Sequence, residues 1–285
     1  GRRLLVFEKT DARMKRVHTV TDTKYAAAVI SSPDNAAYKE LKKLTDTKVI
    51  RKEGKTLVAG KKIIKELWEK NPASCGELVL FDEYRESDEE FNDLIANFRD
   101  ARKLVLLKRS LFAELDVLDA RAPICAVSVH EPAAWDSSPL EGCTVAVPFQ
   151  DPANVGAVIR SAAAFGAKVL LLEGSANPWH PKCVRASGGA VFSVDMQKGP
   201  SLEECASLCR QKKIPLFALD VNGRDIRSAS FPASFILLPG VEGPGVPQNA
   251  GLELLSIPIE PEVESLNAAV AAAIALFQWK SAGKK

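Results

Sequence analysis

Residues 143–173 read CTVAVPFQDPANVGAVIRSAAAFGAKVLLLE, and this stretch decides the fold class. It begins and ends with short apolar runs, CTVAVPF at 143–149 and AKVLLLE at 167–173. Between them, VGAVIRSAAAFG at 155–166 has the apolar spacing of a helix and ends in glycine, a common helix terminator. Near-continuous apolar strands separated by a helix are typical of parallel sheets covered on both faces. The stretch therefore predicts a doubly wound α/β domain.

The alternation of strands and helices extends along most of the chain. Downstream it predicts a helix at 201–213, strands at 215–221, 234–240 and 253–259, and a last helix opening near Ser265. Upstream it predicts helices at 35–45, 61–70, 87–99 and 110–115, and strands at 55–60, 77–81, 103–107 and 123–129. Both halves are therefore expected to be α/β layer structures.

Residues 130–142, HEPAAWDSSPLEG, interrupt this alternation with two prolines, a Ser-Ser pair and no apolar period. They mark the expected boundary between domains. We predict an unassigned extension at 1–32, a smaller α/β domain at 33–131, a linker at 132–141 and a larger α/β domain at 142–285.

Charged residues are unevenly distributed along the chain. Residues 1–75 hold 18 Lys and Arg against 9 Asp and Glu, a balance of +9. The remaining residues hold 20 against 27, a balance of −7. A basic N-terminal third is expected either of a module that binds a polyanion or of a solvated charged face.

The six cysteines, at 75, 125, 143, 183, 205 and 209, include no CxxC pair and no zinc pattern. Reduced, buried thiols are the expectation, and no metal site is predicted. No apolar run approaches the roughly 18 residues of a membrane span. The first residues, GRRLLVFEKTD, lack the features of a signal peptide. These observations favour a cytoplasmic protein.

Three of the predicted strands in the C-terminal half lead into polar segments, where open α/β sheets bind ligands. In DPANVGAVIR, 151–160, Asn154 is expected to cap the helix and Arg160 to lie at the edge of its apolar face, as a functional or a surface residue. In LLPGVEGPGVP, 237–247, three glycines surround Glu242, either in a ligand-binding loop or in a tight turn.

The third polar segment, IPIEPEVESLNAAV at 257–270, opens the last helix. Ser265 is expected to cap that helix, with Asn267 in its first turn. Both residues could equally belong to an active site. The predicted buried stripe of the helix consists of Leu266, Val270, Ile274 and Phe277.

Taken together and in this order, the three segments resemble the three motifs of the SpoU (TrmH) family of RNA methyltransferases, within the SPOUT class. The matching text is NVGAVIRSAAAFGA at 154–167, LLPGVEGPGVP at 237–247 and IPIEPEVESLNAAVAAAIALF at 257–277. HPKCVRASGGAVF at 180–192 is similar to the connecting stretch of that family. The resemblance covers the chain from about residue 140 to the end.

The N-terminal half resembles the substrate-binding domain that often accompanies this catalytic domain. The similar text is KELKKLTDTKVIRKEGKTLVAGKKIIKEL at 39–67, and that domain has an RNA-binding ribosomal-protein fold. The basic balance of the same region agrees with this resemblance. For the C-terminal domain, the resemblance implies a deep trefoil knot and a homodimer whose active sites use both subunits.

The resemblance implies methyl transfer from S-adenosylmethionine to a ribose 2′-hydroxyl of RNA. Gly240, Ile257 and Leu266 match the cofactor-binding positions of the family. Arg160 matches the catalytic arginine, and Asn154, Glu242, Ser265 and Asn267 match its other polar motif residues. Six basic residues are the expected RNA contacts: Lys182, Arg185, Lys42, Lys43, Arg51 and Lys52.

The role of Arg160 has two interpretations. A guanidinium has a pKa above about 12 and is a poor base, which favours phosphate binding and stabilisation of a developing alkoxide. Proton acceptance would require a strongly lowered pKa.

The separate basic domain favours ribosomal RNA over transfer RNA as substrate. A non-catalytic RNA- or ribosome-binding protein is the alternative from another class, although such a protein is expected to lose the arginine or the third motif. A nucleotide-binding oxidoreductase is disfavoured, because the loop QDPAN at 150–154 lacks the phosphate-binding glycines.

Overall fold

The computed structural model describes residues 28–116, 121–240 and 252–282, together with the backbone of short strands at 7–8, 15–16 and 18–19. The chain divides into two compact units, residues 1–130 and residues 131–285, and each is described by itself. Among the described residues, no helix combines the length and the apolar character needed to span a membrane.

The N-terminal unit is built on a five-stranded sheet of order β4-β8-β6-β9-β5. Its strands are β4 (Val29–Ile30), β8 (Leu104–Leu107), β6 (Cys75–Phe81), β9 (Ile124–Ser128) and β5 (Lys55–Ala59). β4, β8 and β6 pair in parallel, whereas β9 is antiparallel to both β6 and β5. The sheet is therefore mixed. Short strands β1 (Phe7–Glu8) and β2 (Lys15–Arg16) pair with each other, and β3 (His18–Thr19) pairs with β7 (Arg85–Glu86).

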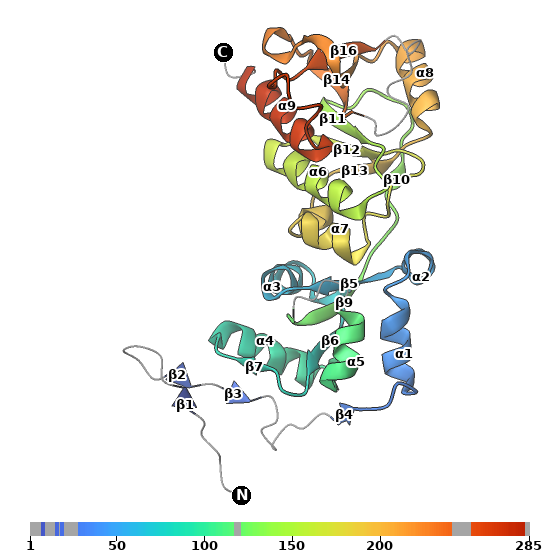
Figure 1. The fold of residues 1–285 in the computed structure, drawn as a ribbon. Helices are drawn as coiled ribbons and strands as arrows, with labels where there is room; N and C mark the ends of the chain where they lie inside the picture. Colours follow the sequence, from blue (N-terminus) through green and yellow to red (C-terminus); the bar gives the residue numbers. More distant parts are fainter. Residues whose placement is uncertain are drawn as a thin grey trace, which may run out of the picture. The chain divides into compact units, whose positions relative to one another are not determined.

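Helices cover both faces of this sheet (Figure 1). They are α1 (Ala36–Lys43), α2 (Thr47–Glu53), α3 (Lys61–Lys70), α4 (Glu89–Asp100) and α5 (Arg109–Leu115), and a 3₁₀ turn, η2, spans Pro72–Ser74. On one face, α1 and α5 contribute Tyr38, Leu41 and Phe112 to a core shared with the strands. On the other face, Trp68 of α3 and Phe98 of α4 pack with ring centroids 4.4 Å apart.

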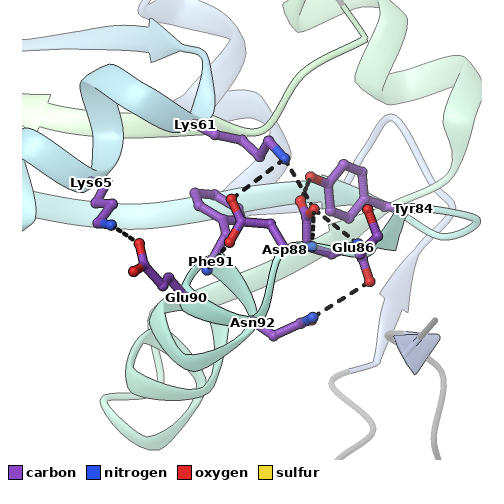
Figure 2. A network of polar contacts seen from close by, with 9 residues as sticks. Lys61, Lys65, Tyr84, Glu86, Asp88, Glu90, Phe91 and Asn92 are labelled. Carbon is purple, nitrogen blue, oxygen red and sulfur yellow. Dashed lines mark hydrogen bonds and ion pairs between the residues drawn. The ribbon is translucent and has the colours of Figure 1, made fainter. Parts of the chain in front are cut away.

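A buried carboxylate, Glu86 on β7, connects three parts of the N-terminal unit (Figure 2). Its side chain is almost wholly enclosed and accepts a hydrogen bond from the Tyr84 hydroxyl. The Lys61 ammonium at the start of α3 lies 3.0 Å away, and the backbone N–H groups of Ser87 and Asp88 each donate at 2.9 Å. The charge of Glu86 is thus fully paired, as a buried carboxylate requires.

The C-terminal unit is built on a seven-stranded sheet of order β10-β13-β12-β11-β15-β14-β16, in which every pairing is parallel. The strands are β10 (Ala133–Ala134), β13 (Met196–Lys198), β12 (Lys168–Leu171), β11 (Gly142–Val147), β15 (Ser234–Leu238), β14 (Leu216–Asp225) and β16 (Glu253–Ser256). The helices are α6 (Pro152–Phe165), α7 (Pro181–Ala186), α8 (Leu202–Lys212) and α9 (Ala268–Ala282), with 3₁₀ turns η3 (Ala190–Phe192) and η4 (Ile226–Ser228).

Helices lie on both faces of the parallel sheet (Figure 1). Ile236 of β15 packs in one core with Cys205 and Cys209 of α8. Its neighbour Phe235 points to the opposite face and meets Trp279 of α9, with ring centroids 5.9 Å apart. Alternate side chains of β15 therefore point into two different cores, one on each face of the sheet. This explains why residues 235–238 are all apolar. The predicted α/β fold with a parallel sheet is confirmed.

The stretch predicted as a linker, 132–141, is partly built into the sheet. Its Ala133 and Ala134 form the edge strand β10, which pairs with β13. Trp135 follows and is buried in the core on the α8 face, with its indole N–H donating to Ser138 O at 2.9 Å. The division between the two units falls just before this stretch, between His130 and Glu131.

Candidate functional site

The first motif opens α6, but its cap is not the expected residue. The Asp151 carboxylate accepts hydrogen bonds from the backbone N–H groups of Ala153 at 3.3 Å and Asn154 at 3.2 Å. Asp151 is therefore the N-cap, with Pro152 as the first helical residue, and the prediction of Asn154 as the cap is wrong. The side chain of Asn154 is instead available for contacts outside its own helix.

The third motif opens α9, and here too the cap differs from the prediction. Asn267 Oδ1 accepts from the backbone N–H groups of Ala269 at 3.0 Å and Val270 at 3.3 Å. Asn267 is thus the cap, and Ser265 lies exposed two residues before it. The amide of Asn267 also donates to Asn154 Oδ1 at 3.2 Å. This hydrogen bond joins the first and third motifs.

The predicted buried stripe of α9 is also wrong. Val270, Ile274 and Phe277 are 49%, 37% and 60% exposed, and Leu266 precedes the helix. The buried face consists of Ala269, Ala272, Ala275 and Leu276. Small side chains allow a close approach between helix backbones, so the alanines face inward and the larger apolar residues face outward.

An open groove of about 470 Å³ lies between α6 and α9. The asparagine pair, Asn154 and Asn267, contributes to its lining, and the rest is mainly apolar: Ala157, Ser161 and Phe165 from α6, and Ala269, Val270, Ala273, Ile274 and Phe277 from α9. Phe165 and Phe277 meet with ring centroids 6.4 Å apart. The exposed apolar residues of α9 are thus part of one continuous surface.

Arg160 lies on α6, one and a half turns after Asn154, and is exposed. It makes no hydrogen bond or ion pair with any residue that the structure describes. Its guanidinium lies against Gly188, just beyond α7. A cation without a carboxylate partner in this region remains available to an anionic ligand.

The connecting stretch forms α7, a helix that the sequence analysis did not predict. Lys182 and Arg185 lie on this helix, and both are exposed without an ion pair to other described residues. His180 caps it, with Nδ1 accepting from the Lys182 N–H at 3.2 Å. Burial, followed by the charge of Lys182, lowers the pKa of His180, so its ring is held neutral as an acceptor.

Two of the three predicted cofactor contacts lie just beyond the carboxyl ends of strands. Gly240 follows β15 and Ile257 follows β16, while Leu266 is half-buried just before α9. Glu242, the polar residue of the second motif, lies outside the described residues. β15 and β16 flank β14 in the parallel sheet, so Gly240 and Ile257 lie at the same edge, where ligands of open α/β sheets bind.

The sequence analysis missed a bulge on β14, which lies between β15 and β16. Leu219 and Arg224 both pair with Leu255, so residues 220–223 project from the sheet. Gly223 allows this, because a Cβ there would lie 2.5 Å from backbone atoms of Leu255. Gly240 is adjacent, since a Cβ there would lie 3.3 Å from Leu219 O. The available signal was the pair Asn222-Gly223, a turn-forming sequence directly after the predicted strand at 215–221.

Three of the four basic residues predicted as RNA contacts in the N-terminal unit have acidic neighbours. Lys42 pairs with Glu114, Lys43 lies 2.6 Å from Glu40, and Lys52 lies 3.5 Å from Glu53. Arg51 on α2 is exposed without an ion pair to the described residues, as is Lys48 one turn earlier. In the regions covered by the structure, no group of three His, Cys, Asp or Glu side chains could hold a metal ion.

Comparison with known proteins identifies the family. Residues 143–277 match the family model described as "SpoU rRNA Methylase family". A 23S rRNA (uridine(2479)-2′-O)-methyltransferase of Streptomyces viridochromogenes is 31% identical over 215 residues, which cover 70% of this chain and 74% of that protein.

A longer relative, ribosomal RNA small subunit methyltransferase G 2 of Syntrophobacter fumaroxidans, is 40% identical over 289 residues. The match covers the whole of this chain but only 55% of that protein. The fold is similar to that of an AdoMet-bound rRNA methyltransferase from Sinorhizobium meliloti, with a TM-score of 0.72, 22% identity, and coverage of 89% of this chain and 97% of that one. On the family match and the Streptomyces relative, the chain belongs to the SpoU rRNA methylase family.

Proposed function

We propose that this chain transfers a methyl group from S-adenosylmethionine to a ribose 2′-hydroxyl of ribosomal RNA. The observation that carries the proposal is the contact between Asn154 and Asn267, which joins the third motif to the helix that also carries Arg160, a cation without an ion pair to the residues that the structure describes. The Streptomyces relative is named for this reaction on 23S rRNA, and the Sinorhizobium structure contains the methyl donor.

Arg160 is suited to act as a cation rather than as a base. A guanidinium donates up to five hydrogen bonds and does not readily lose a proton. Arg160 would bind a phosphate next to the target ribose and stabilise the developing negative charge on its 2′-oxygen. Asn154 and Asn267 would orient the ribose or Arg160, Ser265 would hydrogen-bond nearby backbone or RNA, and Glu242 would brace the glycine loop.

S-adenosylmethionine, when bound, supplies the methyl group on a positively charged sulfur. In the transfer, the bond from the methyl carbon to the ribose 2′-oxygen forms as the carbon–sulfur bond breaks. The hydroxyl proton leaves to water, and the sulfonium becomes a neutral thioether. The role of the protein in this reaction is to hold the ribose 2′-oxygen in line with the methyl group. This alignment removes much of the entropic barrier to transfer.

The methyl donor would lie along the carboxyl edge of β15, β14 and β16. Gly240 and Ile257 follow the two outer strands of this group, so a molecule that contacts both passes the end of β14. Residues Asp220–Gly223, in the bulge, are therefore added to Gly240, Ile257 and Leu266 as cofactor-binding positions. Two observations support adding these residues: β14 lies between β15 and β16 in the sheet, and Gly240 lies close to Leu219, which precedes the bulge.

A homodimer formed through α6 and α9 would cover the apolar groove. Val270, Ile274 and Phe277 form an exposed apolar patch, and patches of this kind mark interaction surfaces in soluble proteins. A second copy of the chain would bury them. Dimerisation would also place the asparagine pair at the rim of the interface. The trefoil knot expected in this unit rests on family membership.

The N-terminal unit would bind the RNA substrate. Its support is the positive balance of the first 75 residues and the exposed Lys48 and Arg51, which have no ion pair to the residues that the structure describes. Lys42 and Lys43 lie on α1, and Lys52 lies on α2. Lys182 and Arg185 of α7 would contact phosphates nearer the reacting ribose. A cytoplasmic location is proposed from the six free, buried cysteines, which are typical of a reducing compartment.

The test combines donor binding with methyl transfer. The purified chain should bind S-adenosylmethionine in calorimetry and methylate ribosomal RNA in preference to transfer RNA. Arg160→Ala should abolish transfer and leave donor binding intact, whereas Arg210→Ala, a matched exposed arginine on α8, should retain activity. Transfer to tRNA alone would reassign the substrate. RNA binding without donor binding would support the non-catalytic alternative and overturn the proposal.

A further inference from the structure

Gly188 ends α7 in the left-handed backbone region, with φ at +60°. The Gly189 N–H donates to Val184 O at 3.2 Å, and the Gly188 N–H donates to Arg185 O at 2.9 Å. This pair of hydrogen bonds is the Schellman arrangement, which favours glycine at this position and tolerates asparagine next best. Helix termination alone therefore accounts for the backbone conformation of Gly188. It does not account for the position of the Arg160 side chain next to this glycine.

The guanidinium of Arg160 lies beside the space that a side chain at Gly188 would occupy. A Cβ added to Gly188 would lie 3.6 Å from both Nε and Cζ of Arg160 and 3.7 Å from Nη1. These nearly equal distances mean that the planar group turns its face toward the glycine, because an in-plane approach would bring a nitrogen clearly closer than the carbon. A planar guanidinium is well suited to such stacking.

The turn that carries Gly188 is held firmly against α6. A Cβ added to Gly156, one helical turn before Arg160, would lie 2.5 Å from Cys183 O and 2.7 Å from the Ala186 side chain. No side chain fits there, so the backbone of α7 rests on that of α6. Ser187 is buried beside this contact, and its hydroxyl donates to Val184 O at 2.9 Å.

We propose that Gly188 is a positioning residue for Arg160 in the reaction proposed above, on which this inference rests. The bare glycine supports one face of the guanidinium, while Gly156 fixes the distance between the support and the helix that carries Arg160. Because guanidinium N–H groups lie in the plane of the group, stacking leaves them free for substrate oxygens. The support therefore restricts the orientation of Arg160 without consuming its hydrogen bonds.

Gly188→Asn tests the support while respecting the backbone. Asparagine is tolerated in the left-handed region, and its Cβ would come into van der Waals contact with the guanidinium, so the rest of its side chain would compete for the space around Arg160. The matched control is Gly174→Asn, since Gly174 has φ at +85° and a Cβ there would meet nothing within 4 Å. Thermal unfolding and calorimetric S-adenosylmethionine binding verify that both variants fold and bind the donor.

The expected result is a fall in kcat of roughly 10²-fold for Gly188→Asn, the size of effect that a misplacement of about 1 Å can produce. Donor affinity and RNA KM should stay close to the wild-type values, and Gly174→Asn should match wild type. In an Arg160→Lys background, Gly188→Asn should cause no further loss, because its effect acts through the guanidinium. Wild-type kcat in Gly188→Asn, or an equal loss in both backgrounds, would overturn the inference.

A second readout does not depend on methyl transfer. In ¹⁵N-labelled protein, the Nε–Hε resonance of Arg160, assigned by its loss in Arg160→Lys, should shift or broaden in Gly188→Asn and stay unchanged in Gly174→Asn. An unchanged resonance in Gly188→Asn would overturn the positioning role. If the wild-type chain methylates no RNA, the proposed function fails, and this measurement still decides whether Gly188 supports Arg160.

Discussion

Asn267 donates a hydrogen bond from Nδ2 to Asn154 Oδ1 over 3.2 Å, although 113 residues separate the two in the chain. The other end of the same amide, Oδ1, accepts from the first N–H groups of α9. One side chain therefore caps a helix and links that helix to the first turn of α6. The link brings two of the three motifs to the same edge of the groove.

The two roles of Asn267 are separable by substitution. Asn267→Ser should retain the cap, since serine is as good an N-cap, but it is too short to reach Asn154. We expect its unfolding free energy to stay within about 0.5 kcal/mol of wild type while methyl transfer falls. Asn267→Ala should lose about 1 kcal/mol as well. Denaturant unfolding and initial rates measure the two effects, and full activity in Asn267→Ser would show that the link to Asn154 is dispensable.

The exposed apolar face of α9 predicts the oligomeric state. Ile274→Asp places a charge in the groove between α6 and α9, and we expect it to convert a dimer to a monomer in sedimentation velocity. Val263→Asp is the control, because Val263 is 48% exposed and does not line the groove. A wild-type monomer, or a dimer that survives Ile274→Asp, would contradict the proposed interface.

The buried face of the same helix predicts a loss of stability. Ala272 and Ala275 are fully enclosed, so Ala272→Leu forces extra methyl groups into a filled core. Overpacking of this kind costs about 1–3 kcal/mol. The exposed Ala164 on α6, replaced in the same way, should change the unfolding free energy little. Equal stability of the two variants in urea titrations would be evidence against the close packing.

Glu86 predicts a pH-dependent contribution to stability in the N-terminal unit. Its burial opposes ionisation, but hydrogen bonds from Tyr84, the Asp88 N–H and Lys61 outweigh burial, so the pKa of Glu86 lies below its ordinary value. A lowered folded-state pKa gives stabilisation that is present above the unfolded pKa of about 4.3 and is lost as pH falls through the folded value.

Glu86→Gln should therefore reduce the unfolding free energy by about 2 kcal/mol at pH 7, the worth of hydrogen bonds to a charged group. The difference from wild type should shrink as the pH falls below about 4. Chemical denaturation over this range measures it. The exposed Glu83→Gln is the control, and a pH-independent difference would show that the charge of Glu86 is not the cause.

His180 predicts a second pH effect, at the start of α7. Its pKa is lowered, so the folded state favours the neutral ring, and the cap on Lys182 is lost as pH falls through that lowered value. His180→Asn should keep the cap without titrating. Stability should consequently fall less between pH 7 and pH 5 in the variant than in wild type, as followed by thermal unfolding. Parallel pH profiles would exclude the capping role.

Elements with strong apolar periodicity were predictable from the sequence. Features that depend on contacts between residues far apart in the chain were not. Ser265 and Asn267 are both good caps, and the choice between them depends on Asn154, which no local pattern contains. The spacing of the larger apolar residues of α9 predicts that they form its buried face, but these residues are exposed. The buried face instead consists mainly of alanines.

Short elements were missed for a different reason. The α7 helix has six residues, too few to display a helical period, and β10 has two. The bulge on β14 depends on Gly223 meeting the backbone of Leu255, a contact between strands. Motif resemblance adds what packing patterns cannot, because it nominates Arg160, Gly240 and Ile257 as site residues, and these assignments stay predictions.

The most direct test of the central claim is mass spectrometry of nucleosides from ribosomal RNA incubated with the chain and methyl-labelled S-adenosylmethionine. The account predicts labelled 2′-O-methylnucleosides with wild type and Arg210→Ala, and none with Arg160→Ala, although that variant still binds the donor. Label on a base, or 2′-O-methylation that persists in Arg160→Ala, would contradict it.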